Sequence, residues 1–156
     1  MLEITGNIFE LDSWSQQPQT KQLALCITTN GIIKTNGDAV MGAGMAKAFT
    51  LVHPQLPKIL GQKLTESGNQ VHYLLSMGNV HILSFPTKHH WRDRSSLTLI
   101  TNSARTLAEL ANLKPDCTFV LTRPGCGLGG LSWSLVRNAI SPILLDNCWV
   151  IDINNT

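Results

Sequence analysis

Two segments of this chain share one order of elements: an apolar strand-like run, a loop rich in glycine, and the start of a helix. The first has its strand at 23–29 and its loop at 31–44, and the second has its strand at 117–122 and its loop at 124–130. Loops that follow parallel strands lie at the same sheet edge, where open α/β sheets bind ligands. The pair therefore predicts an α/β fold in which two glycine loops converge on one ligand.

The rest of the chain also alternates strand-like and helix-like segments, which indicates a layered α/β fold. The polar stretch 13–20 is expected to be a loop. Gly78-Asn79 separates two strand-like runs and predicts a hairpin, so the sheet should be mixed. We expect strands at 2–5, 23–29, 71–77, 80–86, 117–122 and 148–153, and helices at 45–52, 55–67, 95–113 and 132–140. The expected fold class is α/β, a three-layer α/β/α domain over 1–156 with a mixed sheet of roughly six strands.

The helix over 95–113 has the clearest pattern in the chain. Its apolar residues recur with a period of about 3.6 residues, which is typical of a helix with one buried face. Either Ser95 or Ser96 can cap its N-terminus, because a serine hydroxyl accepts from the first free backbone N–H groups.

Composition narrows the class of protein. Hydrophobic residues make up 43% and charged residues 14%, which fits a compact globule and not a disordered chain. A net charge of +2 gives no support for a whole basic face that binds nucleic acid. The four cysteines have neither zinc-site nor CxxC spacing, so we expect no metal site, no disulfide framework and a reducing compartment. Met1–Phe9 has no signal-peptide pattern, and no apolar run approaches about 18 residues, so a cytoplasmic protein without membrane contact is expected.

The first glycine loop reads NGIIKTNGDAVMGAGMA over 30–46. Gly42 and Gly44 let the backbone approach a ligand closely, and the helix that follows favours a phosphate at its N-terminus. The loop has neither GxGxxG spacing nor a GK[ST] step, so it predicts neither a Rossmann dinucleotide site nor a P-loop. Taken alone, it also fits a flexible turn.

The second loop, PGCGLGGLSW over 124–133, has four glycines in six residues, more than a turn requires. A third segment, FPTKHHWRD over 85–93, follows another strand. Its Lys88 could lie near phosphates or act as a nucleophile. The alternative is a solvated basic loop that precedes the next helix.

Together, VMGAGMA at 40–46, FPTKHHWR at 85–92 and GCGLGGLSW at 125–133 resemble the macro domain, the ADP-ribose-binding fold. The resemblance extends over essentially the whole chain. It is strongest to the branch that holds the terminal ADP-ribose protein glycohydrolases and the macro-domain antitoxins that reverse DNA ADP-ribosylation.

This resemblance implies a role for each matching position. Adenine would meet Asn7 and Ile8, and the distal ribose and a phosphate would be wrapped by Val40, Met41, Gly42, Gly44 and Met45. The diphosphate would be cradled by the backbone of Gly125, Cys126, Gly127, Leu128, Gly129 and Gly130. The implied catalytic residues are Lys88 at the anomeric carbon and Asn30 and Asn36 near the distal ribose. Neither a metal nor a cofactor is implied.

Two positions depart from the family pattern. Asn7 stands where the family has an aspartate, although an amide oxygen can still accept from the adenine amino group. Gly129 stands where the glycohydrolase arm has an aspartate, whereas the antitoxin arm also reads GCGLGG. Asp38 is a candidate substitute for that carboxylate, and the alternative is an exposed turn residue.

Three functions remain open at this point. The first is an ADP-ribosyl hydrolase that acts on a modified nucleic-acid base or an acidic protein side chain through Lys88. The second is a non-catalytic ADP-ribose reader module, and the third is a phosphatase for ADP-ribose 1″-phosphate. The expected partner is ADP-ribose or an ADP-ribosylated macromolecule, with transient nucleic-acid contacts from Arg92, Arg94 and Arg123, and the expected state is a monomer.

Overall fold

The computed structural model describes residues 1–15 and 22–153, and within them the chain builds a six-stranded sheet in the order β1-β6-β5-β2-β4-β3. The strands are β1 (Leu2–Thr5), β2 (Gln22–Thr29), β3 (His72–Met77), β4 (Val80–Pro86), β5 (Cys117–Leu121) and β6 (Cys148–Asp152). All neighbouring strands are parallel except the edge strand β3, which runs antiparallel to β4. The mixed sheet and the hairpin at Gly78-Asn79 are thus confirmed.

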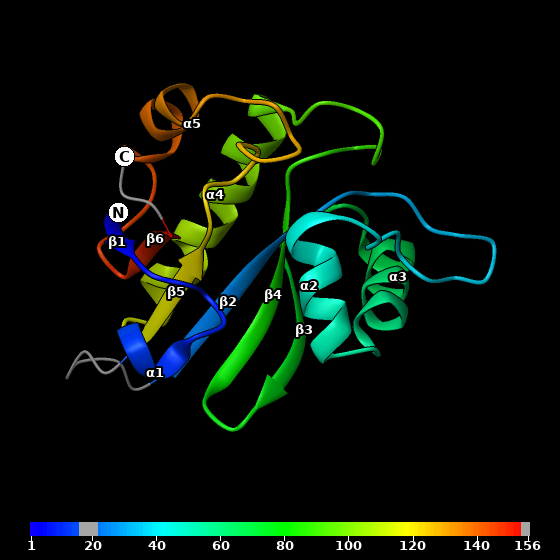
Figure 1. Cartoon of the computed structure of the whole chain (residues 1–156), viewed down its shortest axis with the longest axis horizontal. Coiled ribbons are helices and arrows are strands. Elements are labelled where there is room, and N and C mark those ends of the chain that lie inside the picture. The colour runs from blue at the N-terminus through cyan, green and yellow to red at the C-terminus, as the bar shows by residue number, and fades with distance from the viewer. Residues whose placement is uncertain (16–21, 154–156) are drawn as a thin grey trace.

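Helices cover both faces of this sheet. The helices in the described residues are α1 (Leu11–Trp14), α2 (Gly44–Val52), α3 (Leu56–Ser67), α4 (Leu97–Leu113) and α5 (Trp133–Ile140). Figure 1 shows α2 and α3 together on one side of β2 and β4, with α4 and α5 together on the other. The four expected helices are confirmed with ends shifted by up to two residues. The short helix α1 departs from the loop expected over 13–20, and residues 16–21 of that stretch lie outside the described residues.

Successive side chains of β2 point alternately to two hydrophobic cores, one on each face of the sheet. Leu23, Leu25 and Ile27 point to the layer of α1, α2 and α3, while Ala24 and Cys26 point to the layer of α4 and α5. All five are buried, as expected for a parallel strand covered by helices on both faces. The α/β/α layering is therefore confirmed.

Two serines start the helices that follow the second and third candidate segments. Ser96 caps α4 by accepting from Leu99 N at 3.2 Å, and Ser132 caps α5 by accepting from Leu135 N at 3.3 Å. Of the two serines expected as candidate caps for α4, Ser96 is therefore the N-cap and Ser95 is not. No helix among the described residues is long and apolar enough to cross a membrane.

Candidate functional site

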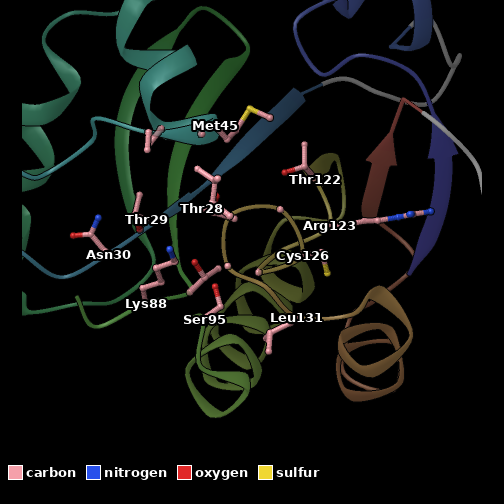
Figure 2. Close-up of a pocket in the computed structure, with 18 of the residues that line it drawn as sticks. Thr28, Thr29, Asn30, Met45, Lys88, Ser95, Thr122, Arg123, Cys126 and Leu131 are labelled. Carbon is pink, nitrogen blue, oxygen red and sulfur yellow. The ribbon is translucent and has the colours of Figure 1, made fainter. Parts of the chain in front are cut away.

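The structure brings the two glycine loops together around a cavity of about 880 Å³, a volume typical of small-molecule sites. Its wall includes the loop 40–46 after β2, the turn 125–129 after β5, and Thr87 and Lys88 after β4. The ends of β1 and β6 complete it with residues 6–8 and 151–153. Figure 2 shows side chains from these segments facing the same space. Both loops therefore converge on one cavity, and the ligand expected there stays a prediction.

Asn30 fixes the first loop at its base. Its Nδ2 donates to Val40 O at 2.9 Å, and its Oδ1 accepts from Ile32 N at 3.0 Å. Val40 N in turn donates to Ile32 O at 3.0 Å. Asn30 lines the cavity, but both ends of its amide are already engaged in shaping the loop.

Helix α3 supports the same loop from behind through Gly61. A Cβ at Gly61 would overlap Gly37 O and lie 2.9 Å from Ala39 N, and Ala39 N donates to Pro57 O at 2.8 Å. The loop backbone therefore packs directly against the helix. The sequence carried a signal for this contact, because glycine is unfavourable inside a helix and can have a packing reason there.

Two glycines of the cavity wall have no packing reason to be glycine. A Cβ at Gly42 or at Gly127 would meet nothing within 4 Å, and neither residue has a positive φ in the left-handed range. Both line the cavity. Their missing side chains therefore leave free space on the ligand side of the loops.

Gly125 and Gly129 are glycine for a different reason. Gly125 has a φ of +76°, and a Cβ there would lie 2.6 Å from Ile100 Cδ1. A Cβ at Gly129 would overlap Ser95 Oγ and lie 2.5 Å from Gly125 O. The turn is thus packed tightly against the start of α4, and this backbone has no room for an aspartate at position 129.

Lys88 lies on a segment tied to the end of β2. Thr87 N and Lys88 N both donate to Thr29 O, at 3.0 and 3.4 Å, and Asn69 Nδ2 donates to Lys88 O at 3.0 Å. The half-buried Lys88 side chain lines the cavity, and its Nζ donates to Trp91 O at 3.5 Å. In Figure 2 it lies between Asn30 and Ser95.

An aromatic and basic cluster forms the rim beside Lys88. The ring of Trp91 is stacked with His90 at a centroid distance of 5.4 Å, and the Arg92 guanidinium lies 4.7 Å from its centroid. Trp91 lines the cavity and remains 44% exposed. The rim therefore offers a partly exposed aromatic group next to two basic residues.

At the other end of the cavity, Asn7 is engaged with its own turn. Its Oδ1 accepts from Phe9 N at 3.0 Å, and its backbone carbonyl accepts from Trp14 Nε1 at 2.8 Å. The Asp152 carboxylate, which the sequence did not indicate as a site residue, lines this end and pairs with Arg123 at 3.0 Å. This end of the cavity therefore holds both an amide and a carboxylate.

Most of the predicted site residues line this one cavity. They are Asn7, Ile8, Asn30, Val40, Met41, Gly42, Gly44, Met45, Lys88, Gly125, Cys126, Gly127, Leu128 and Gly129. Sequence reasoning missed the hydroxyls of Thr29 and Thr87, and it considered Ser95 only as a helix cap.

The structure does not bring Asn36, Asp38 or Gly130 to the cavity wall. Asn36 and Asp38 bond to each other in an outlying turn, where Asn36 Oδ1 accepts from Asp38 N at 3.0 Å. An isolated bridge between Ile33 and Ala39 closes that turn, which Figure 1 shows extending beside α3. Gly130 has a φ of +78° and presents its carbonyl to Arg94 Nη2 at 2.7 Å. All three therefore lie outside the cavity wall, and the roles expected of Asn36 and Gly130 at a ligand stay predictions.

Cys126 does not supply a nucleophile to this cavity. Burial raises the pKa of its thiol, the nearby Arg123 lowers that pKa in part, and Asp152 raises it again. The thiol therefore stays protonated at neutral pH, and it is the thiolate that reacts. Within residues 1–15 and 22–153, no group of three or more His, Cys, Asp or Glu side chains could hold a metal ion.

Several proteins of known structure share this architecture. The macrodomain of Thermus aquaticus DarG superimposes with a TM-score of 0.71 and 26% identity, over 97% of both chains. This chain has the macrodomain fold. The macrodomain of Mycobacterium tuberculosis DarG shares the fold with a TM-score of 0.66 and 24% identity, over 82% of this chain and 87% of that one.

Two further comparisons concern longer proteins. Thermosipho africanus DarTG, solved in complex with ADP-ribose, matches the macrodomain with a TM-score of 0.65 and 23% identity, over 85% of this chain and 42% of that one. A DNA ADP-ribosyl transferase–DNA ADP-ribosyl glycohydrolase fusion protein from Thermosipho africanus (strain H17ap60334) is 38% identical over 78 residues. That match spans 49% of this chain and 17% of the fusion protein. No protein-family model matches the sequence. The chain therefore spans less than half the length of these two proteins.

Proposed function

We propose that this macrodomain, taken as one unit over 1–156, binds ADP-ribose and hydrolyses an ADP-ribosyl linkage to a nucleic-acid base or an acidic side chain. One observation carries the proposal: both glycine loops and Lys88 line the same cavity of about 880 Å³. The relatives add support, because one is solved with ADP-ribose and another is a DNA ADP-ribosyl glycohydrolase fusion.

The arrangement of the wall supports this choice of ligand. Gly42 and Gly127 leave the backbones of two loops bare toward the cavity, as a pyrophosphate-binding wall requires. Asn7 and Asp152 lie at the ends of β1 and β6, and Asn30 and Lys88 follow β2 and β4, so the two pairs line the cavity from opposite sides of β5. An elongated ligand with a base at one end and a reactive sugar at the other fits this order.

Lys88 can carry the chemistry at the sugar end. Its amine adds to the anomeric carbon of the distal ribose while the bond from that carbon to the carrier breaks. The carrier leaves with the bonding electron pair and takes up the proton that the lysine releases. Water then adds to the same carbon, the lysine leaves with its proton restored, and free ADP-ribose results.

The missing carboxylate at position 129 makes a reader module the second candidate. The Asp152 carboxylate lies at the opposite end of the cavity and pairs with Arg123, and Asp38 lies outside the wall. In the hydrolase, the lysine itself must therefore supply the covalent step. In the reader, the same cavity binds ADP-ribose and releases nothing.

The deciding experiment combines binding and turnover. Isothermal titration calorimetry with ADP-ribose, with AMP and ATP as controls, tests the ligand. Release of ADP-ribose from modified DNA and from ADP-ribosylated protein tests the reaction. We expect Lys88→Ala to abolish release and to keep the affinity within about 10-fold, because covalent catalysis needs the amine and the loops supply most of the binding.

The matched control is Lys34→Ala, which removes a lysine from the outlying turn and should leave turnover unchanged. Undiminished release by Lys88→Ala contradicts the lysine mechanism. Tight binding by the wild type without release from either substrate identifies the reader instead.

A further inference from the structure

The Ser95 hydroxyl is a buried polar group without a partner. Ser95 is 7% exposed, and its Oγ has no hydrogen-bond partner among the described residues. A hydroxyl left this way destabilises a fold, because it gives up its bonds to water and gains none in return. Such exceptions in native proteins usually have a role to explain them.

The neighbouring residue removes the simplest structural explanation. Ser96, not Ser95, caps α4, since the Ser96 hydroxyl accepts from Leu99 N. The backbone of Ser95 is bonded normally, with its N–H donated to Gly129 O at 3.0 Å. Only the hydroxyl is left over, so helix capping does not account for it.

The position of this hydroxyl points to the cavity. Ser95 lines the wall directly before α4, a helix of 17 residues whose N-terminus favours an anion. It packs against the turn 125–129 so closely that a Cβ at Gly129 would overlap Ser95 Oγ. In Figure 2 the hydroxyl is directed from the start of the helix into the space beside Lys88 and this turn.

We propose that Ser95 is a ligand-binding residue whose hydroxyl donates a hydrogen bond to an anionic oxygen of a phosphate group bound against the turn 125–129. This inference rests on the proposed function for the identity of the whole ligand, but the phosphate contact itself does not depend on the sugar or the base. The phosphate oxygen is then the hydrogen-bond partner that Ser95 Oγ lacks among the described residues.

The test is Ser95→Ala, measured in the full chain by calorimetry with two probes, ADP-ribose and inorganic pyrophosphate. We expect the affinity for both to fall by about 10-fold to 100-fold, the loss of one hydrogen bond to a charged group. The melting temperature without ligand should stay the same or rise, because the variant removes an unpaired buried hydroxyl.

Ser103→Ala is the matched control, on the same helix and equally buried at 5% exposure. Its hydroxyl has a protein partner, since it donates to Pro86 O at 2.8 Å. This variant should lower the melting temperature by about 2–4 °C and leave both affinities unchanged. The two serines thus separate a ligand-binding hydroxyl from a structural one.

The outcomes distinguish this inference from the proposed function. If the wild type binds ADP-ribose and Ser95→Ala binds it equally well, the inference is overturned and the proposed function stands. If the wild type fails to bind ADP-ribose, the proposed function fails, and pyrophosphate decides the role of Ser95. Weaker pyrophosphate binding by Ser95→Ala then supports the contact, while equal binding, or no binding by the wild type, overturns it.

Discussion

Gly127 and Gly129 are separated by one residue in the same turn, yet substitution with alanine should damage different properties of the protein. A methyl group at Gly127 enters open space on the cavity side, with nothing within 4 Å. A methyl group at Gly129 overlaps Ser95 Oγ and lies 2.5 Å from Gly125 O. The first change should affect binding, and the second should affect folding.

The magnitudes follow from these surroundings. Overpacking at Gly129 destabilises the fold by about 1–3 kcal/mol, which lowers the melting temperature of a chain of this size by about 2–12 °C. Gly127 has no left-handed backbone, so alanine there should stabilise the fold by about 0.4–1 kcal/mol through the unfolded chain. Under the proposed function, its methyl group would hold a phosphate away from the loop backbone, and losing one such hydrogen bond should lower affinity by about 10-fold to 100-fold.

Thermal unfolding without ligand and calorimetry with ADP-ribose measure the two effects separately. Each variant is the control for the other, since both add one methyl group to the same turn. Wild-type affinity in Gly127→Ala would show that no ligand approaches the backbone here. A melting temperature within about 1 °C of the wild type in Gly129→Ala would refute the claim that the turn is packed against α4.

Two further predictions concern the support of the site and of the fold. Gly61→Ala should push the backbone at Gly37 away from α3 and lower the stability of the fold by about 1–3 kcal/mol. The shifted loop 40–46 should also weaken ADP-ribose binding. A wild-type melting temperature and a wild-type affinity by calorimetry would contradict this. Glu3 accepts from Arg137 Nε at 2.8 Å, and this bond is the main reason that its pKa lies below the ordinary 4.5. A lowered pKa stabilises the fold above the unfolded value, and this contribution is lost as the pH falls through the folded pKa. The melting-temperature difference between the wild type and Glu3→Gln should therefore be largest near pH 7 and shrink below about pH 4, and a constant difference from pH 3 to pH 7 would contradict it.

The fold could be predicted from the sequence because its signals are local and agree with one another. The continuous apolar runs of β2 and β5 indicated buried parallel strands, and the period of α4 indicated one buried face. Helix α1 was not predicted because it has only four residues, too few for a periodic pattern to appear. Element ends moved by one or two residues, since helix caps depend on tertiary contacts that propensity does not contain.

The parts of the site formed by the loop backbone could be predicted from the sequence better than the parts formed by side chains. Gly42, Gly125, Gly127 and Gly129, which indicated the two loops in the sequence, all line the cavity. The family resemblance implied Asn36 near the distal ribose, but Asn36 bonds to Asp38 in a local turn outside the cavity wall. Distance along the chain cannot distinguish a residue at the mouth of a loop from one at its outlying tip.

Ser95 shows why part of a site remains invisible until the fold is known. In the sequence it is one of two adjacent serines before a helix, and both satisfy the rule for an N-cap. Only Ser96 caps the helix, and the turn 125–129, some thirty residues further along, packs against Ser95, which lines the cavity and whose buried Oγ has no partner among the described residues. The same contact excludes a side chain at Gly129, so the loss of a carboxylate there and the presence of a hydroxyl at position 95 are two consequences of one packing arrangement. A variant that places a carboxylate at position 129 should therefore need a smaller residue at position 95, and Ser95→Gly combined with Gly129→Asp should unfold at a higher temperature than Gly129→Asp alone.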